Sequence, residues 1–336
     1  MDAFLRFLRW VYDPDIPFGD WVKQGIRWLQ KNADWFFDGI HSVLSTVYEA
    51  FFSVLTGPPY WVIILIFAAL AWVASSWRLA LFTVIGFWFI QGFGQWQNAM
   101  STISLVVLAV LCALLLSIPL GIWAARSDTV SKIVKPVLDL MQTMPAMVYL
   151  VPAITIFGIG PTPGAIATLI FAMPPGVRLT ELAIRQVDEE LVEAGYAFGS
   201  TPGRVLRQIQ LPAATPTIMA GVNQVIMLAL SMVVLAGMAG AGGLGGDVVG
   251  SLTTLNVPLG VEAGLAVVII AIFLDRTSAS VGQRRHKRRR VRSTSKAASA
   301  AETQADDDDG HNDGTDETRA ASEQPVTTDD TERRTV

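Results

Sequence analysis

Two long stretches of the sequence contain no charged side chain. No Asp, Glu, Lys or Arg occurs between Glu49 and Arg78, or between Arg78 and Arg126. A helix needs about 20 apolar residues to cross the hydrocarbon core of a membrane, and uncharged stretches of this length are typical of lipid-exposed helices. The chain is 51% hydrophobic and 16% charged, a balance that soluble domains rarely reach. The sequence therefore predicts an all-α, polytopic membrane protein.

Apolar runs divide the membrane region into about seven expected spans. The boundary between the first two is the weakest, because little more than Ser76, Trp77 and Arg78 separates them. An odd number of spans places the two termini on opposite sides of the membrane. The expected spans are residues 60–76, 79–94, 100–125, 145–160, 163–180, 214–240 and 259–275.

The basic residues predict the orientation in the cell membrane. The loops at 95–99, around 160–163 and at 241–258 contain no Lys or Arg. Cytoplasmic loops carry an excess of Lys and Arg, so the other set of loops is expected inside, the N-terminus outside and the C-terminus in the cytoplasm. The basic set consists of Arg78, Arg126, Lys132, Lys135, Arg178, Arg185, Arg204, Arg207 and the run at 284–292. At the end of a span such a run is expected to touch anionic lipid rather than nucleic acid.

Four regions follow one another along the chain. Residues 1–58 are expected to form an amphipathic helical region on the outer side of the membrane. Residues 59–280 form the membrane domain, and residues 281–296 form a basic segment beside the membrane. Residues 297–336 form an acidic cytoplasmic tail that is expected to be disordered, with twelve Asp or Glu and three Arg for a net charge of −9.

One apolar stripe marks the first region as a helix. Two placements remain open for this helix and are compatible: within the membrane interface, or packed on the membrane domain of its own chain. Tryptophan is enriched at membrane interfaces, which favours the first placement. The stripe consists of Phe37, Ile40, Leu44, Val47, Phe51 and Leu55, and the tryptophans nearby are Trp10, Trp21, Trp28 and Trp35.

The sequence predicts no catalytic residues and no metal site. Cys112 is the only cysteine, and the three histidines make no ligand spacing. There is no Gly-rich phosphate loop ending in Gly-Lys. The run GAGGLGG at 240–246 follows an apolar span rather than a strand, so it is expected to be a flexible or tightly packed outer turn. Glu189 and Glu190 are adjacent on an expected helix and point in different directions, which favours a solvated face.

Residues 181–212 combine helix and turn signals on the expected cytoplasmic side. A helix is expected over 181–198, followed by Gly199 at its C-terminus. Thr201 and Pro202 suit the cap and first turn of a second, short helix, which Leu211-Pro212 is expected to stop. One side of the second helix is apolar and is expected to face lipid or a groove on a partner protein. The apolar side carries Val205, Leu206 and Ile209, and the polar side carries Arg204, Arg207 and Gln208.

The spacing in this loop resembles a known motif. Glu193-Ala194-Gly195, three residues, Gly199, nine residues and then Ile209-Gln210-Leu211-Pro212 are similar to the EAA loop of importer permeases, the membrane subunits of ATP-binding-cassette uptake systems. Gly195 departs from the motif, which usually has Ala there.

Four further segments resemble glycine betaine/proline betaine permeases, and the resemblance covers roughly residues 95–280. The segments are LDLMQTMPAMVYLVP (138–152), IFGIG (156–160), FAMPPGVRLTEL (171–182) and PTIMAGVNQVIMLALSMVV (216–234).

The resemblance implies a type I importer permease fold that pairs as a homodimer. Cytoplasmic ATPase subunits would bind ATP and Mg²⁺, so this chain would bind no cofactor, and an extracytoplasmic substrate-binding protein would deliver glycine betaine or a related quaternary-ammonium solute. Residues 202–209 would dock on the ATPase. By resemblance, the coupling residues are Glu193, Ala194, Gly195, Gly199, Thr201, Pro202, Arg204, Val205, Leu206, Ile209, Leu211 and Pro212.

Three polar residues lie inside the sixth expected span: Asn223, Gln224 and Ser231. They are candidates for lining the pathway, although hydrogen bonding between helices is the interpretation that we favour. Two other functions remain open for the whole chain. One is a permease of the same fold with another cargo, such as an amino acid or a sulfonate. The other is an ATP-independent channel or scaffold.

Overall fold

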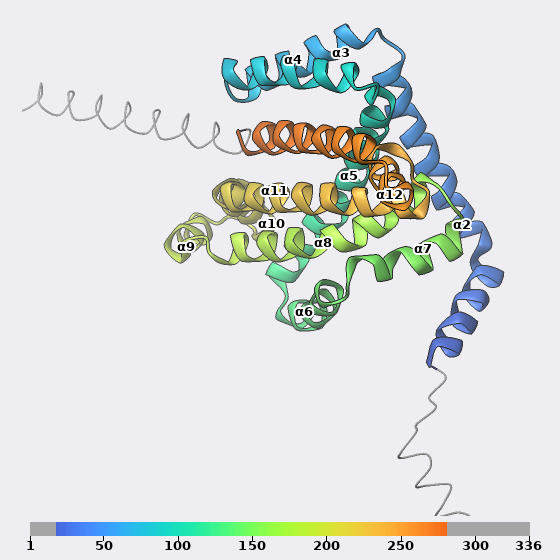
Figure 1. Cartoon of the computed structure of the whole chain (residues 1–336). Helices are drawn as coiled ribbons and strands as arrows, with labels where there is room; N and C mark the ends of the chain where they lie inside the picture. The colour runs from blue at the N-terminus through green and yellow to red at the C-terminus, as the bar shows by residue number, and fades with distance from the viewer. Residues whose placement is uncertain (1–17, 281–336) are drawn as a thin grey trace, which may run out of the picture. The chain divides into compact units, whose positions relative to one another are not determined.

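The computed structural model describes residues 18–280 (Figure 1), in which every regular element is helical. The basic segment 281–296, the acidic tail 297–336 and the first 17 residues lie outside the described residues. The helices are α2 (Phe18–Thr56), α3 (Tyr60–Ala74), α4 (Trp77–Gly92), α5 (Trp96–Arg126), α6 (Asp128–Thr143), α7 (Leu150–Phe157), α8 (Pro161–Arg185), α9 (Glu189–Ala197), α10 (Pro202–Val205), α11 (Leu211–Ala236), α12 (Gly243–Thr254) and a last helix, Val257–Ser280. Short 3₁₀ turns precede α7 and follow α11.

Within residues 18–280, four helices are long and apolar enough to cross a membrane: Trp96–Arg126, Pro161–Arg185, Pro202–Ala239 and Val257–Ser280. The number rises to six if two bent pairs each count as one span. These pairs are α2 with α3, bent by 101°, and α6 with the segment Ala146–Phe157, bent by 107°. The seven expected spans correspond to helices, but three of these are too short to cross a membrane alone: α3, α4 and α7 have 15, 16 and 8 residues.

The centre of the membrane domain is built from α5, α8 and α11, which approach one another at small residues. A Cβ atom on Gly176 of α8 would lie 2.6 Å from Ser117 Oγ of α5, and one on Gly121 of α5 would lie 2.6 Å from Thr180 Cβ of α8. Small residues at such positions let membrane helices pack closely, because lipid supplies no hydrophobic driving force between them. These glycines therefore hold the spans that lead into and out of residues 186–210.

Three phenylalanines join the short helices to the last one. Phe67 of α3, Phe87 of α4 and Phe273 of the last helix lie with ring centroids 5.1 to 5.5 Å apart. Edge-to-face packing at these distances is favourable beyond the apolar area that it buries. The hairpin of α3 and α4 is therefore anchored on the helix Val257–Ser280.

Helix α2 packs on the membrane domain of its own chain, as one of the two expected placements predicted. Figure 1 shows it passing the ends of several spans. Tyr48 Oη lies 2.8 Å from Ser101 Oγ of α5, and Gln30 Nε2 donates to the Thr155 carbonyl of α7 at 2.8 Å. Its placement in the membrane interface stays a prediction, which the exposed side chains of Trp21, Trp28 and Trp35 favour.

The glycine-rich run after α11 forms a tight turn, one of the two forms expected for it, and opens a helix that was not expected. Gly243 has a φ of +64°, and a Cβ there would lie 2.6 Å from Thr102 Oγ1 of α5. The same hydroxyl accepts a hydrogen bond from Leu244 N at 2.9 Å, and Asn98 Nδ2 donates to Asp247 Oδ2 at 2.6 Å. These contacts to α5 stabilise α12 although glycine is a poor helix former.

Candidate functional site

The turn after α9 has the geometry that the sequence predicts. Gly199 has a φ of +72°, in the left-handed region that glycine adopts at little cost. Gly199 N donates to the Tyr196 carbonyl at 2.8 Å, and Ser200 N donates to the Gly195 carbonyl at 3.1 Å. This pair of bonds is the Schellman motif, which satisfies the last carbonyls of a helix. The turn therefore has one defined conformation.

The second helix of the loop, which consists of α10 (Pro202–Val205) and the π-helical turn Leu206–Gln210, begins at the expected residues. The Thr201 carbonyl accepts hydrogen bonds from Arg204 N at 2.9 Å and from Val205 N at 3.0 Å, and Pro202 occupies the first turn. The Thr201 side chain makes no capping hydrogen bond, in contrast to its expected role. The fixed φ of Pro202 thus sets the start of this helix.

Two expected helix boundaries are wrong. The helix expected over 181–198 is broken at 186–188, because α8 continues to Arg185 and α9 starts anew at Glu189. Leu211-Pro212 does not stop the second helix, because the chain runs through a π-helical turn, Leu206–Gln210, directly into α11. A π turn shifts the hydrogen-bond pattern by one residue, which places Pro212 in the first turn of α11, where its missing N–H costs little.

The apolar side of the second helix packs within its own chain and not on lipid or a partner as expected: Val205 and Ile209 lie against Gly195 of α9, and Leu206 lies against the ends of the spans. Val205 and Leu206 are only 1% and 8% exposed. Leu206 packs in a buried cluster at the ends of the spans, and the π turn aims it there. The other members of the cluster are Ala183 and Ile184 of α8, Ala214 of α11, and the partly buried Ile122 and Ala125 of α5. Leu206 therefore links this helix to the ends of α5, α8 and α11.

Close packing explains why Gly195 stands where the motif usually has Ala. A Cβ atom on Gly195 would lie 2.5 Å from Ile209 Cδ1 and 3.3 Å from Val205 Cγ2. The two helices of the loop therefore touch at a position where even alanine requires Ile209 to move. Together with the Schellman turn, this contact makes α9 and the second helix one compact unit.

The predicted coupling residues divide into three groups. Gly195, Val205 and Leu206 are buried, and Ile209, Leu211 and Pro212 are partly buried at the junction with α11. The remaining predicted residues are exposed: Glu193, Ala194, Gly199, Thr201, Pro202 and Arg204. Phe198 is not among the predicted coupling residues, but its side chain is 90% exposed beside the turn. The exposed surface of the loop thus combines polar groups with apolar side chains, of which Phe198 is the most exposed and Leu191 and Tyr196 are about half exposed.

A buried carboxylate beside the loop was missed. Glu181 is 4% exposed, and its Oε1 accepts a hydrogen bond from Ser131 Oγ of α6 at 2.7 Å. Lys135 Nζ lies 3.3 Å and Arg185 Nε 3.0 Å from the same oxygen. Arg185 also reaches Asp128 Oδ1 at 2.8 Å, and the hydrogen bond and charge of its guanidinium lower the pKa of Asp128. The only indication of this ion pair in the sequence was the spacing of Glu181 and Arg185, which lie four residues apart on a helix.

Within one copy of the chain, the described hydrogen bonds of the three polar residues inside α11 do not join two helices, so their role between helices stays a prediction. Ser231 Oγ donates to the Met227 carbonyl of its own helix at 3.1 Å, and Gln224 is exposed. Asn223 Oδ1 is buried and has no hydrogen-bond partner among the described residues. In that part of the chain, no group of three or more His, Cys, Asp or Glu is arranged to hold a metal ion.

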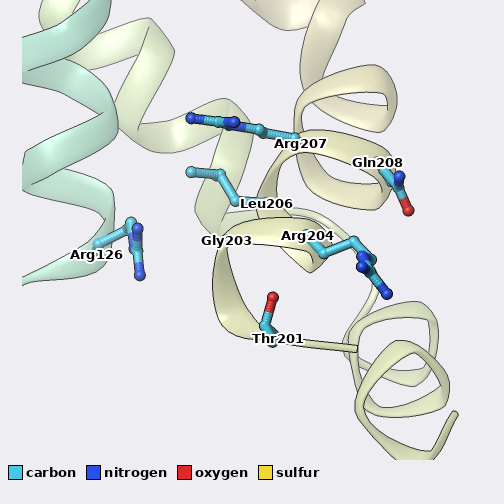
Figure 2. A pocket seen from close by; sticks show the side chains of 7 residues that line it. All are labelled: Arg126, Thr201, Gly203, Arg204, Leu206, Arg207 and Gln208. Carbon is cyan, nitrogen blue, oxygen red and sulfur yellow. The ribbon is translucent and has the colours of Figure 1, made fainter. Parts of the chain in front are cut away.

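A cavity of about 500 Å³ lies between the loop and the end of α5 (Figure 2). It is lined by Arg126 of α5 and by six residues of the segment after Gly199: Thr201, Gly203, Arg204, Leu206, Arg207 and Gln208. Figure 2 shows Arg207 reaching toward α5, while Arg204 and Gln208 project from the other side of their helix. The lining residues include three arginines and no Asp or Glu, and Figure 2 shows Arg126 and Arg207, but not Arg204, on the side of α5.

Comparison with known proteins identifies relatives over most of the chain. Residues 117–291 match the family described as binding-protein-dependent transport system inner membrane component. The chain is 48% identical to the glycine betaine transport system permease protein OpuAB of Bacillus subtilis (strain 168), over 82% of this chain and 98% of that protein. It is 44% identical to the glycine betaine/proline betaine transport system permease protein ProW of Escherichia coli (strain K12), over 81% of this chain and 77% of that protein.

A third relative and a solved structure agree with these matches. The chain is 46% identical to the glycine betaine/carnitine transport permease protein GbuB of Listeria monocytogenes serotype 1/2a (strain 10403S), over 81% of this chain and 97% of that protein. An inward-facing structure of the MetNI methionine ABC transporter covers 57% of this chain and 95% of the matched chain, with a TM-score of 0.52 and 19% identity. The expected all-α permease fold is confirmed by this likeness.

Proposed function

Because the chain belongs to the family of inner membrane components of binding-protein-dependent transport systems, we propose that it moves glycine betaine or a related quaternary-ammonium osmoprotectant across the cell membrane. The observation that carries this cargo is 48% identity over 98% of OpuAB, a protein named for glycine betaine. Relatives named for proline betaine and carnitine extend the same chemistry, a quaternary nitrogen and a carboxylate in one molecule.

The chain is a transport subunit rather than an enzyme, and its proposed partners supply the remaining steps. A cytoplasmic ATPase binds ATP and Mg²⁺, so this subunit needs no cofactor of its own. A substrate-binding protein outside the membrane delivers the solute, and two copies of the permease pair as a homodimer in contact with membrane lipid. The charge bias of the loops supports an outer N-terminus and a cytoplasmic C-terminus.

The proposed coupling step uses the loop as a rigid lever. The partner ATPase contacts the exposed residues, including Glu193, Arg204 and the ring of Phe198. Closure of the ATPase pair displaces α9 and the second helix together, because Gly195 is packed against Ile209. Leu206 passes the displacement to the ends of the spans with which it packs. A well-packed element with two alternative arrangements transmits a displacement of this kind, whereas a flexible loop does not.

Uptake of labelled glycine betaine into vesicles tests this function. The vesicles contain the permease, its ATPase and its substrate-binding protein, with ATP on the ATPase side. We expect uptake that requires ATP and that unlabelled proline betaine or carnitine inhibits, because these solutes share the quaternary ammonium group. The matched control uses an ATPase whose nucleotide site is inactivated.

Two outcomes contradict the proposal in different ways. Uptake that proceeds equally without ATP indicates a channel. ATP-driven uptake of an amino acid or a sulfonate, with none of glycine betaine, keeps the permease and replaces the cargo.

A further inference from the structure

Three arginines line one cavity without any neutralising acid. Arg126 comes from the end of α5, and Arg204 and Arg207 come from the second helix of the loop. Figure 2 shows Arg126 across the space from Gly203, with Arg207 extended toward the same helix α5. Because the Arg204 side chain projects from the other side of its helix, Arg126 and Arg207 are the two cations that an anion bound in the cavity would neutralise.

Three other cations at the ends of the spans have acidic partners, which the cavity arginines lack within the described residues. Lys135 and Arg185 lie against Glu181, and Arg178 forms an ion pair with Asp139. None of the ion pairs among residues 18–280 includes one of the three cavity arginines. Carboxylates therefore lie beside Lys135, Arg178 and Arg185 but, in this part of the chain, are not paired with the arginines of this cavity.

The cavity adjoins the end of a helix that is long and apolar enough to cross a membrane. Arg126 is the last residue of α5, a 31-residue apolar helix that qualifies as a span. Trp123 lies one turn earlier on the same face and is 62% exposed. An exposed tryptophan followed by a basic residue at the end of a span is typical of the boundary between hydrocarbon and water.

We propose that this cavity binds the phosphate group of an anionic membrane phospholipid. The guanidinium group is planar and binds phosphate oxygens through two parallel hydrogen bonds, so Arg126 and Arg207 suit a phosphate held between them. Basic pockets beside membrane helices bind anionic head groups by the same chemistry. The volume of about 500 Å³ falls within the range of roughly 300–1,000 Å³ that ligand sites occupy.

A lipid in this position bridges two elements that the proposed transport step moves. Arg126 belongs to α5, and Arg207 belongs to the helix whose Leu206 packs beside Ile122 and Ala125 of α5. The bound phosphate therefore strengthens the attachment of the loop to α5. The binding itself does not depend on the cargo, so it can be tested apart from transport.

Native mass spectrometry of the purified full-length permease, titrated with dioctanoyl-phosphatidylglycerol, measures the binding. We compare the natural chain with the double variant Arg126→Gln/Arg207→Gln, and with Arg78→Gln as the control. Arg78 is an exposed arginine outside the cavity, so its removal changes the net charge but not the site. We expect the double variant to lose one tightly bound lipid, with at least a tenfold rise in its Kd, and Arg78→Gln to keep it.

Two further ligands separate the sources of phosphate. Dioctanoyl-phosphatidylcholine, whose head group has no net charge, is expected to bind at least tenfold more weakly, and inorganic phosphate alone is expected not to displace the anionic lipid. Equal binding of the two lipids, or displacement by millimolar inorganic phosphate, contradicts a site for anionic lipid. If the lipid is released when the ATPase subunit is added, the cavity binds acidic groups of that partner. This outcome also overturns the proposal.

Folding of the variants is checked separately. All three substituted arginines are exposed and lie outside the ion pairs of the described residues, so the melting temperature is expected to stay unchanged. If the double variant melts early, the single variant Arg207→Gln replaces it. Lipid binding by a folded Arg207→Gln variant at the natural affinity overturns the proposal.

Discussion

Arg185 Nε lies 3.0 Å from Glu181 Oε1, one helical turn earlier in α8, and this ion pair lies at the end of α8, directly before residues 186–210. Ser131 and Lys135 of α6 contact the same carboxylate oxygen. Arg185 also donates to the Ala124 carbonyl of α5 at 2.9 Å. The ends of α5, α6 and α8 are therefore joined at the point where the loop departs.

Replacement of Glu181 by Gln is expected to loosen this junction. The amide keeps the size of the side chain but leaves Lys135 and Arg185 without its charge. We expect a loss of about 1–3 kcal/mol in the free energy of unfolding, since both cations are partly exposed and a hydrogen bond to Ser131 can remain. Chemical denaturation in detergent measures this loss. Glu189→Gln removes an exposed carboxylate as the control, and equal stability of the two variants contradicts the role of Glu181.

Turn chemistry was predictable from the sequence because it is local. The left-handed turn at Gly199 and the helix start at Pro202 depend on the dihedral angles of those residues themselves, and the structure has both. Four of the seven spans were predictable for a similar reason, since apolar length decides whether a helix can cross lipid. The other three expected spans, 60–76, 79–94 and 145–160, form shorter helices of 15, 16 and 8 residues.

Features that depend on distant residues were not predictable. The side chain of Leu206 is apolar whether it faces lipid, a partner or its own spans, and only the packing against α5 and α8 decides among them. Ser131, which bonds Glu181, lies 50 residues away in the sequence. Helix α12 depends on Thr102, 142 residues from Leu244, and its glycines gave no helical signal.

Gly199→Val is expected to impair transport by straining the turn. The site has open space around it, so the cost arises from the φ of +72° alone. A β-branched residue in this region costs of order 1–3 kcal/mol. ATP-driven uptake should fall while the variant still inserts into the membrane. Gly199→Asn is the matched control, because asparagine tolerates the left-handed region, and we expect it to keep most activity. Normal uptake by the valine variant contradicts the assigned role.

Gly195→Leu is expected to separate the two helices of the loop. The new side chain collides with Ile209, whose Cδ1 lies 2.5 Å from the Cβ position. We expect ATP hydrolysis by the complex to continue while glycine betaine uptake drops several-fold. Gly195→Ala should be tolerated, because the end of the Ile209 side chain can rotate away. The double variant Gly195→Leu/Ile209→Ala should recover part of the uptake, and an absence of recovery indicates that the contact does not transmit the motion.

Single cysteines test the orientation of the membrane domain. Cys112 is first replaced by Ala, and cysteines are then placed at Gln97, Asn256 and Arg204, which are all exposed. Gln97 is chosen rather than its neighbour Asn98, because the Asn98 side chain donates a hydrogen bond to Asp247. An impermeant thiol reagent added to intact cells should label the first two positions and not the third. Labelling at Arg204 inverts the orientation and removes the loop from the ATPase.

The acidic tail allows a test of ionic-strength sensing. Residues 297–336 carry a net charge of −9 and follow the basic run at 284–292. Opposite charges within about 10 Å attract at low salt and are screened at high salt, so tail and basic run are candidates for a contact that releases when cytoplasmic salt rises. The competing hypothesis, which we favour, is a solubilising tail, because disordered acidic segments commonly have no sensing role.

Deletion of residues 297–336 separates the two hypotheses. With a solubilising tail, uptake in vesicles should keep its dependence on internal salt, because the removed charges take no part in the transport step. With a sensing tail, the basic run 284–292 stays free at every salt concentration, so the deleted protein should be equally active at low and high internal salt. The measurement is the uptake rate across a series of internal salt concentrations. A control variant with the same tail length, in which the twelve Asp and Glu are replaced by Asn and Gln, distinguishes charge from length.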